Sequence, residues 1–263
     1  MGIVRHPIEI PVMPQTKIWR YLDTPKFESL MYERALFFCR CDKFADPFEG
    51  SIPKKEFDFM EQYANQYHDD SDEIGNRLKS NRNGLALMRQ KFKRQIVVNC
   101  WHINNSESDA MWRLYVKDNE GVAISTTVEN LTRSLESCQV NVGSSRVRYL
   151  DFEVDTWYHS DDYPVNHATL LTPVLHKRKE FAYESEFRIY HHVNEAINND
   201  DFWTSQPNHK GMLIPVDVER LINEVILHPT SGDDVKNQVE KIMVTNGFEF
   251  PIRTSAMKNV PLY

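Results

Sequence analysis

Two patterns of hydrophobic and polar positions alternate along the chain, one typical of strands and one typical of helices. Short apolar runs rich in β-branched and aromatic residues predict strands at 17–22, 35–41, 96–103, 121–126, 147–154, 211–216, 224–229 and 250–257. Amphipathic segments predict helices at 27–34, 106–116, 127–135 and 233–247, and a mostly helical stretch at 166–181. Several strands follow one another without room for a crossover helix. We therefore predict a single α+β domain over 1–263 with a mixed, mainly antiparallel sheet.

One long segment departs from this alternation. Residues 53–95 are charged and helical in pattern, with Pro53 at the position that suits the start of a helix. Breaks are expected near Gly75 and Gly84. We expect this segment to be a helical insertion into the domain.

Polar residues at the ends of the predicted helices indicate where these begin and stop. Ser106 with Asp109 resembles a capping box, and Thr126 with Glu129 forms a second one. The second capping box makes Thr126 a helix N-cap and leaves its neighbours Ser125 and Thr127 without a role. Gly247 fits the C-cap of the last long helix.

Charge and composition restrict the classes of function. The net charge is −7 and the isoelectric point about 5.8, which argue against a globally basic surface for duplex nucleic acid. A local basic patch at Lys91, Lys93 and Arg94 remains open. The four cysteines lack zinc-type spacing, and no signal peptide or apolar run of about 20 residues is present. We therefore expect a cytoplasmic protein with reduced thiols and no membrane partner. No pattern indicates an oligomeric state.

Two glutamates lie one residue apart in the strand-like run FAYESEFRIYHH (181–192). In a strand, Glu184, Glu186 and Arg188 share one face. One interpretation is a solvated face on which Arg188 neutralises a carboxylate, an ion pair worth at most ~1 kcal/mol. The other is a carboxylate with an altered pKa inside a cleft.

Two further side chains have both a structural and a chemical interpretation. Arg20 on the first strand is either salt-bridged or a bidentate phosphate ligand. His102 ends a strand before a polar loop, where imidazole can serve as a base, a donor or a core residue. His191 and His192 are adjacent, so in a strand they point in opposite directions and cannot share one metal. No metal site is predicted.

The order of these residues resembles the arginine, Ser-Thr-Ser, Glu-x-Glu arrangement of the ADP-ribosyltransferase toxins. Residue by residue, the resemblance implies Arg20 as the ligand of the NAD phosphates and Ser125 with Thr127 as site-ordering hydroxyls. It implies Glu186, assisted by Glu184, as the catalytic carboxylate. Thr127 stands where the family has serine. The resemblance also implies a split sheet of the ADP-ribosyltransferase type.

The hypothesis that follows is an NAD-dependent mono-ADP-ribosyltransferase-like protein, a bacterial toxin or anti-phage defence effector. NAD is the substrate in this hypothesis, and the acceptor stays open between a protein, a nucleic acid and a small molecule. His102 is the third candidate catalytic residue. Trp101 or Tyr183 would stack on the nicotinamide ring.

A second resemblance covers nearly the whole chain. LFFCRCDKFADPFEG, NCWHINNSESDAMWRLY, GVAISTT, HKRKEFAYESEFRIY and VILHP resemble an uncharacterised bacterial family, the domain of unknown function 2971. That resemblance implies a family and not a reaction. The residues its motifs indicate are Asp46, Glu49, Trp101, His102, Glu107, Trp112, Glu184, Glu186 and Arg188.

Two other classes of function stay open. A metal-dependent nuclease or phosphodiesterase would gather acidic side chains around Mg²⁺. Its acids would be Asp46, Glu49, Glu184 and Glu186, but the sequence lacks the lysine that such sites place in an E-x-K spacing. A non-catalytic ligand sensor would line a pocket with Trp101, His102 and Trp112.

Overall fold

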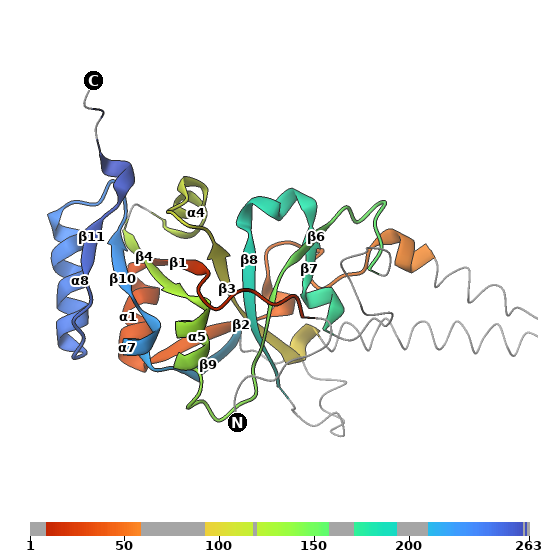
Figure 1. The fold of residues 1–263 in the computed structure, drawn as a ribbon, viewed down its shortest axis with the longest axis horizontal. Helices are drawn as coiled ribbons and strands as arrows, with labels where there is room; N and C mark the ends of the chain where they lie inside the picture. The colour runs from red at the N-terminus through yellow and green to blue at the C-terminus, as the bar shows by residue number, and fades with distance from the viewer. Residues whose placement is uncertain are drawn as a thin grey trace, which may run out of the picture.

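A computed structural model describes residues 9–58, 93–117, 120–157, 171–193, 210–259 and 261. Nine strands of these residues form one sheet (Figure 1). Its main path runs β11 (Ile252–Thr254), β10 (Glu224–Leu227), β4 (Gly121–Thr127), β1 (Lys17–Asp23), β3 (Ile96–Ile103), β2 (Ala35–Arg40) and β9 (Gly211–Pro215). Strand β8 (Glu186–His192) pairs with β3, and β5 (Gly143–Arg146) pairs with β8. Within this sheet β10 and β11 are parallel, and the other pairs are antiparallel. The predicted α+β fold with a mixed, mainly antiparallel sheet is confirmed.

The sheet divides at β3. One edge of β3 pairs with β8 along residues 96–102. On the other edge, β2 pairs at residues 97–98 and β1 at residues 102–103, and the register places no partner opposite residues 99–101. Side chains bind there instead: Asn99 donates to the carbonyl oxygen of Phe37 at 2.9 Å, and Arg20 donates to that of Cys100 at 2.8 Å. The division therefore brings Arg20 to the middle of β3.

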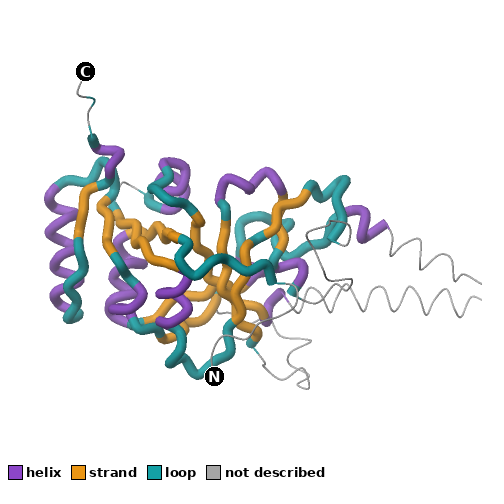
Figure 2. Tube along the Cα trace, viewed as in Figure 1, coloured by secondary structure: helices purple, strands orange, loops and turns teal. Residues whose placement is uncertain are grey.

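The main core lies on one face of the sheet. The helices that contribute to it are α1 (Thr24–Glu33), α5 (Val128–Ser134), α7 (Val218–Leu221) and α8 (Asp233–Thr245). Figure 1 and Figure 2 show α1, α7 and α8 near the end of the sheet that carries β10 and β11. On the opposite face, α4 (Asp109–Tyr115) buries Met111 and Trp112 against β1 and β4. A separate apolar cluster on that second face includes Ile96 and Val98 of β3. Polar residues occupy the middle of the second face, between these two apolar clusters.

The observed helix caps lie one or two residues from the predicted ones. Thr127 caps α5 and accepts from the amide of Asn130 at 3.2 Å, whereas Thr126 is a buried residue of β4. Ser108 caps α4 in place of Ser106. In both helices the chain stays extended beyond the predicted cap, so the capping-box pattern alone misplaced the start. Gly247 has a positive φ of 80° just after α8, as its capping role requires.

The largest difference concerns the predicted helix at 166–181. Its described part contains the 3-10 turn η2 (Thr172–Val174), the short strand β7 (His176–Arg178) and the start of the 3-10 segment η3 (Lys179–Glu184). Strand β7 pairs in parallel with β6 (Arg148–Leu150), the observed part of the predicted strand 147–154. A pairing between segments so distant in the chain overrides local helical periodicity.

Other expectations fall partly outside the described residues. Residues 54–58 and 93–95 are helical, and the rest of the predicted insertion, including Gly75, Gly84 and Lys91, is not described. All four cysteines are free thiols. Among the described helices, none has the length and apolar content needed to cross a bilayer.

Candidate functional site

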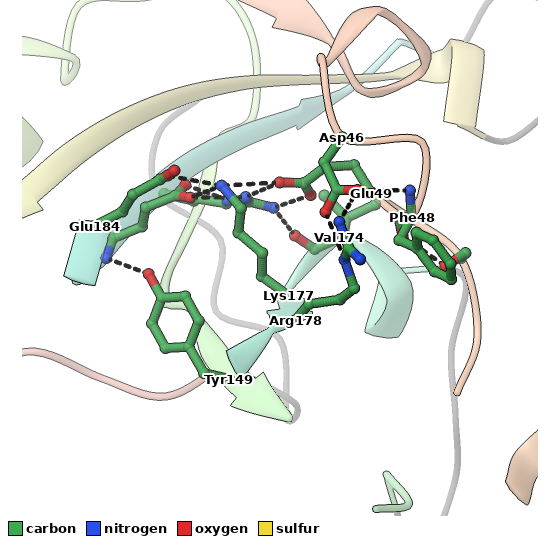
Figure 3. Close-up of polar contacts among 11 residues, drawn as sticks. Asp46, Phe48, Glu49, Tyr149, Val174, Lys177, Arg178 and Glu184 are labelled. Carbon is green, nitrogen blue, oxygen red and sulfur yellow. Dashed lines mark hydrogen bonds and ion pairs between the residues drawn. The ribbon is translucent and has the colours of Figure 1, made fainter. Parts of the chain in front are cut away.

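Five charged side chains converge on the second face of the sheet and form what we call the charged cluster. Its members are Glu49, Lys177, Glu184, Glu186 and Arg188. They come from the turn after β2, from β7, from the end of η3 and from β8. Figure 3 shows their side chains directed toward one another. No side chain of the cluster is more than 9% exposed. Burying five charges is costly unless each finds a partner, so their contacts decide what the cluster can do.

Lys177 stands at the centre of the cluster. Its Nζ lies 2.7 Å from an oxygen of Glu184, 2.7 Å from an oxygen of Glu186 and 3.2 Å from an oxygen of Glu49. Burial lowers the pKa of Lys177, but the three carboxylates raise it more, so the pKa lies above its ordinary value. Lys177 therefore remains a cation and draws the three acids together.

Arg188 bridges two of the same carboxylates. Its Nε and Nη2 donate to Glu186 at 2.8 and 3.2 Å, while Nη1 and Nη2 donate to Glu49 at 3.1 and 2.9 Å. Such forked contacts are among the strongest that a carboxylate makes. Burial raises the pKa of Glu186, but Arg188 and Lys177 lower it more, to well below its usual range. Glu186 is therefore ionised at neutral pH, with both oxygens engaged.

Glu184 differs from the other two acids. Lys177 is its cationic partner, at 2.7 Å. Burial and the neighbouring Glu186 raise the pKa of Glu184 to about 7, and Lys177 opposes this shift only in part. Glu184 therefore retains its proton to a higher pH than an ordinary glutamate does. A group with this pKa is suited to take up or release a proton during a reaction.

A left-handed residue lets the two glutamates meet. Glu184 ends η3 and β8 begins at Glu186, so the expectation that both share one face of a single strand is wrong. Ser185 between them has φ 40° and ψ 57°, which turns the chain and directs both carboxylates to Lys177. The carbonyl oxygen of Ser185 accepts from the amide of Ile103 at 2.8 Å, which ties this turn to β3.

His102 lies beside the charged cluster. It is the register partner of Glu186 in the β3–β8 ladder. Its Nδ1 lies 2.6 Å from the carbonyl oxygen of Glu184, and a carbonyl only accepts, so Nδ1 carries the hydrogen. Burial lowers the pKa of His102, so the ring is neutral. Its buried Nε2 has no hydrogen-bond partner within the described part of the chain.

Arg20 reaches the middle of β3 from the other face of the sheet. It follows Trp19 on β1 and therefore starts from the main-core face, opposite to Glu186. Its guanidinium donates to the carbonyl oxygen of Cys100. Burial raises the pKa of the Cys100 thiol, and the nearby Glu186 carboxylate adds to this rise. Among the described residues, Arg20 forms no ion pair with a carboxylate. Burial lowers its pKa.

Three of the predicted site residues lie elsewhere. Ser125 donates to Glu224 at 2.8 Å and is separated from Glu186 by three strand spacings, roughly 14 Å at the usual distance between neighbouring strands. Thr127 caps α5. Trp101 is 1% exposed in the main core, on the face opposite to the cluster. The structure thus brings Glu184, Glu186 and His102 together, leaves Arg20 on the opposite face of the sheet, and separates the hydroxyl pair from them.

The structure also shows where the acids of the nuclease alternative lie. Three of them surround Lys177, while Asp46 binds Arg178 through contacts of 2.8 and 3.2 Å. Within the described residues, no group of three or more histidine, cysteine, aspartate or glutamate side chains is arranged to hold a metal ion. The ammonium group of Lys177 occupies the centre of the acids. Sequence reasoning missed Lys177, because its segment has a helical pattern and it reaches the glutamates only through the pairing of β7 with β6.

Comparisons with known proteins give one match. A family model described as "Protein of unknown function (DUF2971)" matches residues 111–189. The comparisons with curated proteins and with solved structures found no match. The matched segment runs from α4 into β8 and includes four of the five residues of the charged cluster. It supports the relationship to this family of unknown function and leaves the ADP-ribosyltransferase arrangement without support.

Proposed function

We propose that the charged cluster is the active site of an NAD-using, ADP-ribosyltransferase-like enzyme that breaks the bond between nicotinamide and ribose. The observation that carries the proposal is the pairing of two unlike carboxyls. Glu184 has a pKa of about 7, and Glu186 beside it is held ionised by Arg188 and Lys177. Two carboxyls with separated pKa values are the arrangement used to cleave glycosidic bonds.

Cleavage of the nicotinamide–ribose bond depends mainly on where the protein places its charges. The bonding electrons leave with nicotinamide, which departs as a neutral ring, and positive charge develops on the ribose. A carboxylate at this point stabilises the transition state. The acceptor nucleophile then bonds to the ribose carbon and gives up a proton. Glu184 is suited to both roles, since its ionised form is an anion and can receive that proton.

In this proposal, Glu186 has a different role from the one implied by the toxin resemblance. Its oxygens accept from Lys177 and Arg188 and are not open to a substrate. In the proposal it is a positioning residue that fixes Lys177 and raises the pKa of Glu184. His102 donates to the backbone of Glu184 and holds the same turn.

Arg20 supports a phosphate-containing substrate. A guanidinium has five N–H donors, and the described contacts use one of them, to Cys100. A half-buried arginine without a carboxylate partner favours an anionic ligand, and the planar fork fits phosphate oxygens.

The test is release of nicotinamide from NAD by the purified chain. We expect Glu184→Gln to reduce the rate by about 100-fold or more, the usual range for loss of acid–base catalysis. Glu107→Gln is the matched control, because the Glu107 side chain is 4% exposed and also pairs with an arginine, Arg253, at 2.7 Å. Equal rates for Glu184→Gln and the wild type, or no release by the wild type, would refute the proposal.

A second candidate is a nuclease or phosphodiesterase, favoured by one observation. Lys177 supplies the lysine that the sequence pattern lacked, in contact with Glu184 and Glu186. This alternative predicts cleavage of RNA or DNA that stops on addition of a chelator. Activity toward NAD without such cleavage would eliminate it.

A further inference from the structure

An exposed group of rings lies next to the charged cluster. We call it the aromatic platform, and its members are Phe48, Arg178, Phe181 and Tyr183. The Arg178 guanidinium lies 4.4 Å from the ring centre of Phe48 and 5.4 Å from that of Phe181. The rings of Phe181 and Tyr183 are 6.4 Å apart. Phe48 is 43% and Tyr183 50% exposed, so flat apolar surface faces the solvent.

The platform is held in place by a buried acid. The Asp46 side chain, only 4% exposed, accepts two hydrogen bonds from Arg178 and a third from the amide of Phe48 at 3.1 Å. The ring of Phe48 also meets that of Phe152 edge-on at 6.2 Å. A single exposed ring is ordinary on a protein surface. Phe48 and Arg178, however, are held by a buried carboxylate, so they lose little conformational entropy when a ligand binds.

The same turn serves the platform and the charged cluster. Glu49 follows Phe48 directly and belongs to the cluster, and Lys177 precedes Arg178 (Figure 3). The Nζ of Lys177 lies 4.7 Å from the ring centre of Phe181 and 2.7 Å from Glu186. A ligand that lies on the platform is therefore within one nucleotide's reach of the carboxyls.

Charge selects the kind of ring. Arg178 is the charge that the platform presents to solvent, because its side chain is 29% exposed while that of its partner Asp46 is only 4% exposed. This cation disfavours a positively charged ring such as the nicotinamide of NAD. A neutral purine is not disfavoured, and its stacking on aromatic side chains is favourable. We propose that the aromatic platform binds the adenine base of a nucleotide. The identification of that nucleotide as NAD rests on the proposed function, whereas the platform itself rests on its own contacts.

Binding of AMP tests the platform without any turnover. Isothermal titration calorimetry is expected to show AMP binding to the wild type and about 10-fold weaker binding to Tyr183→Ala, in the range known for one base stacked on one ring. Tyr183→Trp is expected to restore the affinity. Tyr32→Ala is the control, since Tyr32 is a 73% exposed tyrosine of α1. No AMP binding by the wild type, or equal binding by Tyr183→Ala, would overturn the inference.

Two substrates separate this inference from the proposed function. Tyr183→Ala should raise the KM for NAD about 10-fold and leave the cleavage of nicotinamide mononucleotide, which has no adenine, unchanged. If neither compound is cleaved while AMP binding responds to Tyr183 as expected, the proposed function is wrong and the platform stands. If NAD is cleaved but neither KM nor AMP binding responds to Tyr183, the platform is wrong and the proposed function stands.

Discussion

Replacing Glu184 with glutamine should stabilise the protein at alkaline pH. Glutamine has the shape of the protonated glutamate but cannot ionise. In the unfolded chain Glu184 ionises near 4.5, and in the folded protein its pKa is about 7. The unfolded state therefore releases this proton first, and the contribution of Glu184 to stability falls as the pH rises from 4.5 to 7. The variant should not show that fall.

The size of the effect follows from the same two pKa values. Each factor of ten in the ionisation constant corresponds to about 1.4 kcal/mol. The raised pKa of Glu184 can therefore lower the free energy of unfolding by at most about 3 kcal/mol. The Glu184 side chain is 8% exposed, so solvent screening reduces this value only modestly. We expect Glu184→Gln to unfold like the wild type at pH 5 and to be more stable by about 1–3 kcal/mol at pH 8.

Urea unfolding at pH 5 and pH 8 measures this difference. Glu186→Gln is the informative comparison, because the pKa of Glu186 is lowered and its ionised form stabilises the folded state. That variant should be less stable than the wild type by about 3 kcal/mol at pH 8, since Arg188 loses a buried partner. If Glu184→Gln is also destabilised at pH 8, Glu184 is an ordinary ion-pair partner of Lys177 and our argument about its proton is wrong.

Three further substitutions test the geometry of the cluster. Arg188→Met should destabilise the protein by about 3–5 kcal/mol in urea unfolding, because two buried carboxylates lose their partner. Arg113→Met, whose side chain is 79% exposed and pairs with the 63% exposed Asp109, should cost at most about 1 kcal/mol; equal costs would contradict the burial of the Arg188 contacts. Lys177→Met should make stability fall more steeply between pH 5 and pH 8 than in the wild type, since the acids lose the cation that favours their ionised forms; a parallel pH profile would count against its central position. Ser185→Val should cost about 1–2 kcal/mol at the positive φ of this residue, whereas Ser185→Gly should be nearly neutral; thermal melts of the pair would show no difference if the turn is not left-handed.

Much of the fold was predictable because hydrophobic periodicity is a local property. The strands at 17–22, 35–41, 96–103 and 121–126 and the last long helix appear close to their predicted bounds. Each of these elements has a clear apolar pattern, and its apolar side chains are buried against neighbouring elements. The pattern failed where pairing is distant in the chain, as for β7, whose partner β6 lies 28 residues earlier.

The candidate site was only partly predictable for the same reason. The glutamate pair and His102 stand out in the sequence because acidic and imidazole groups interrupt strand-like runs. Lys177 has no such context, and its role depends on the turn at Ser185 and on β7. Ser125 is a hydroxyl at the end of a strand, as the toxin resemblance requires, but the order of the strands puts β1 and β3 between it and Glu186.

The most direct test of the central claim combines activity and stability in one pair of variants. Nicotinamide release from NAD at pH 7.5 should fall by about 100-fold or more in Glu184→Gln while its resistance to urea rises, and Glu107→Gln should keep its activity. Full activity in Glu184→Gln, or an activity loss that merely follows a loss of stability, would contradict the assignment of Glu184 as the proton-carrying group of an active site.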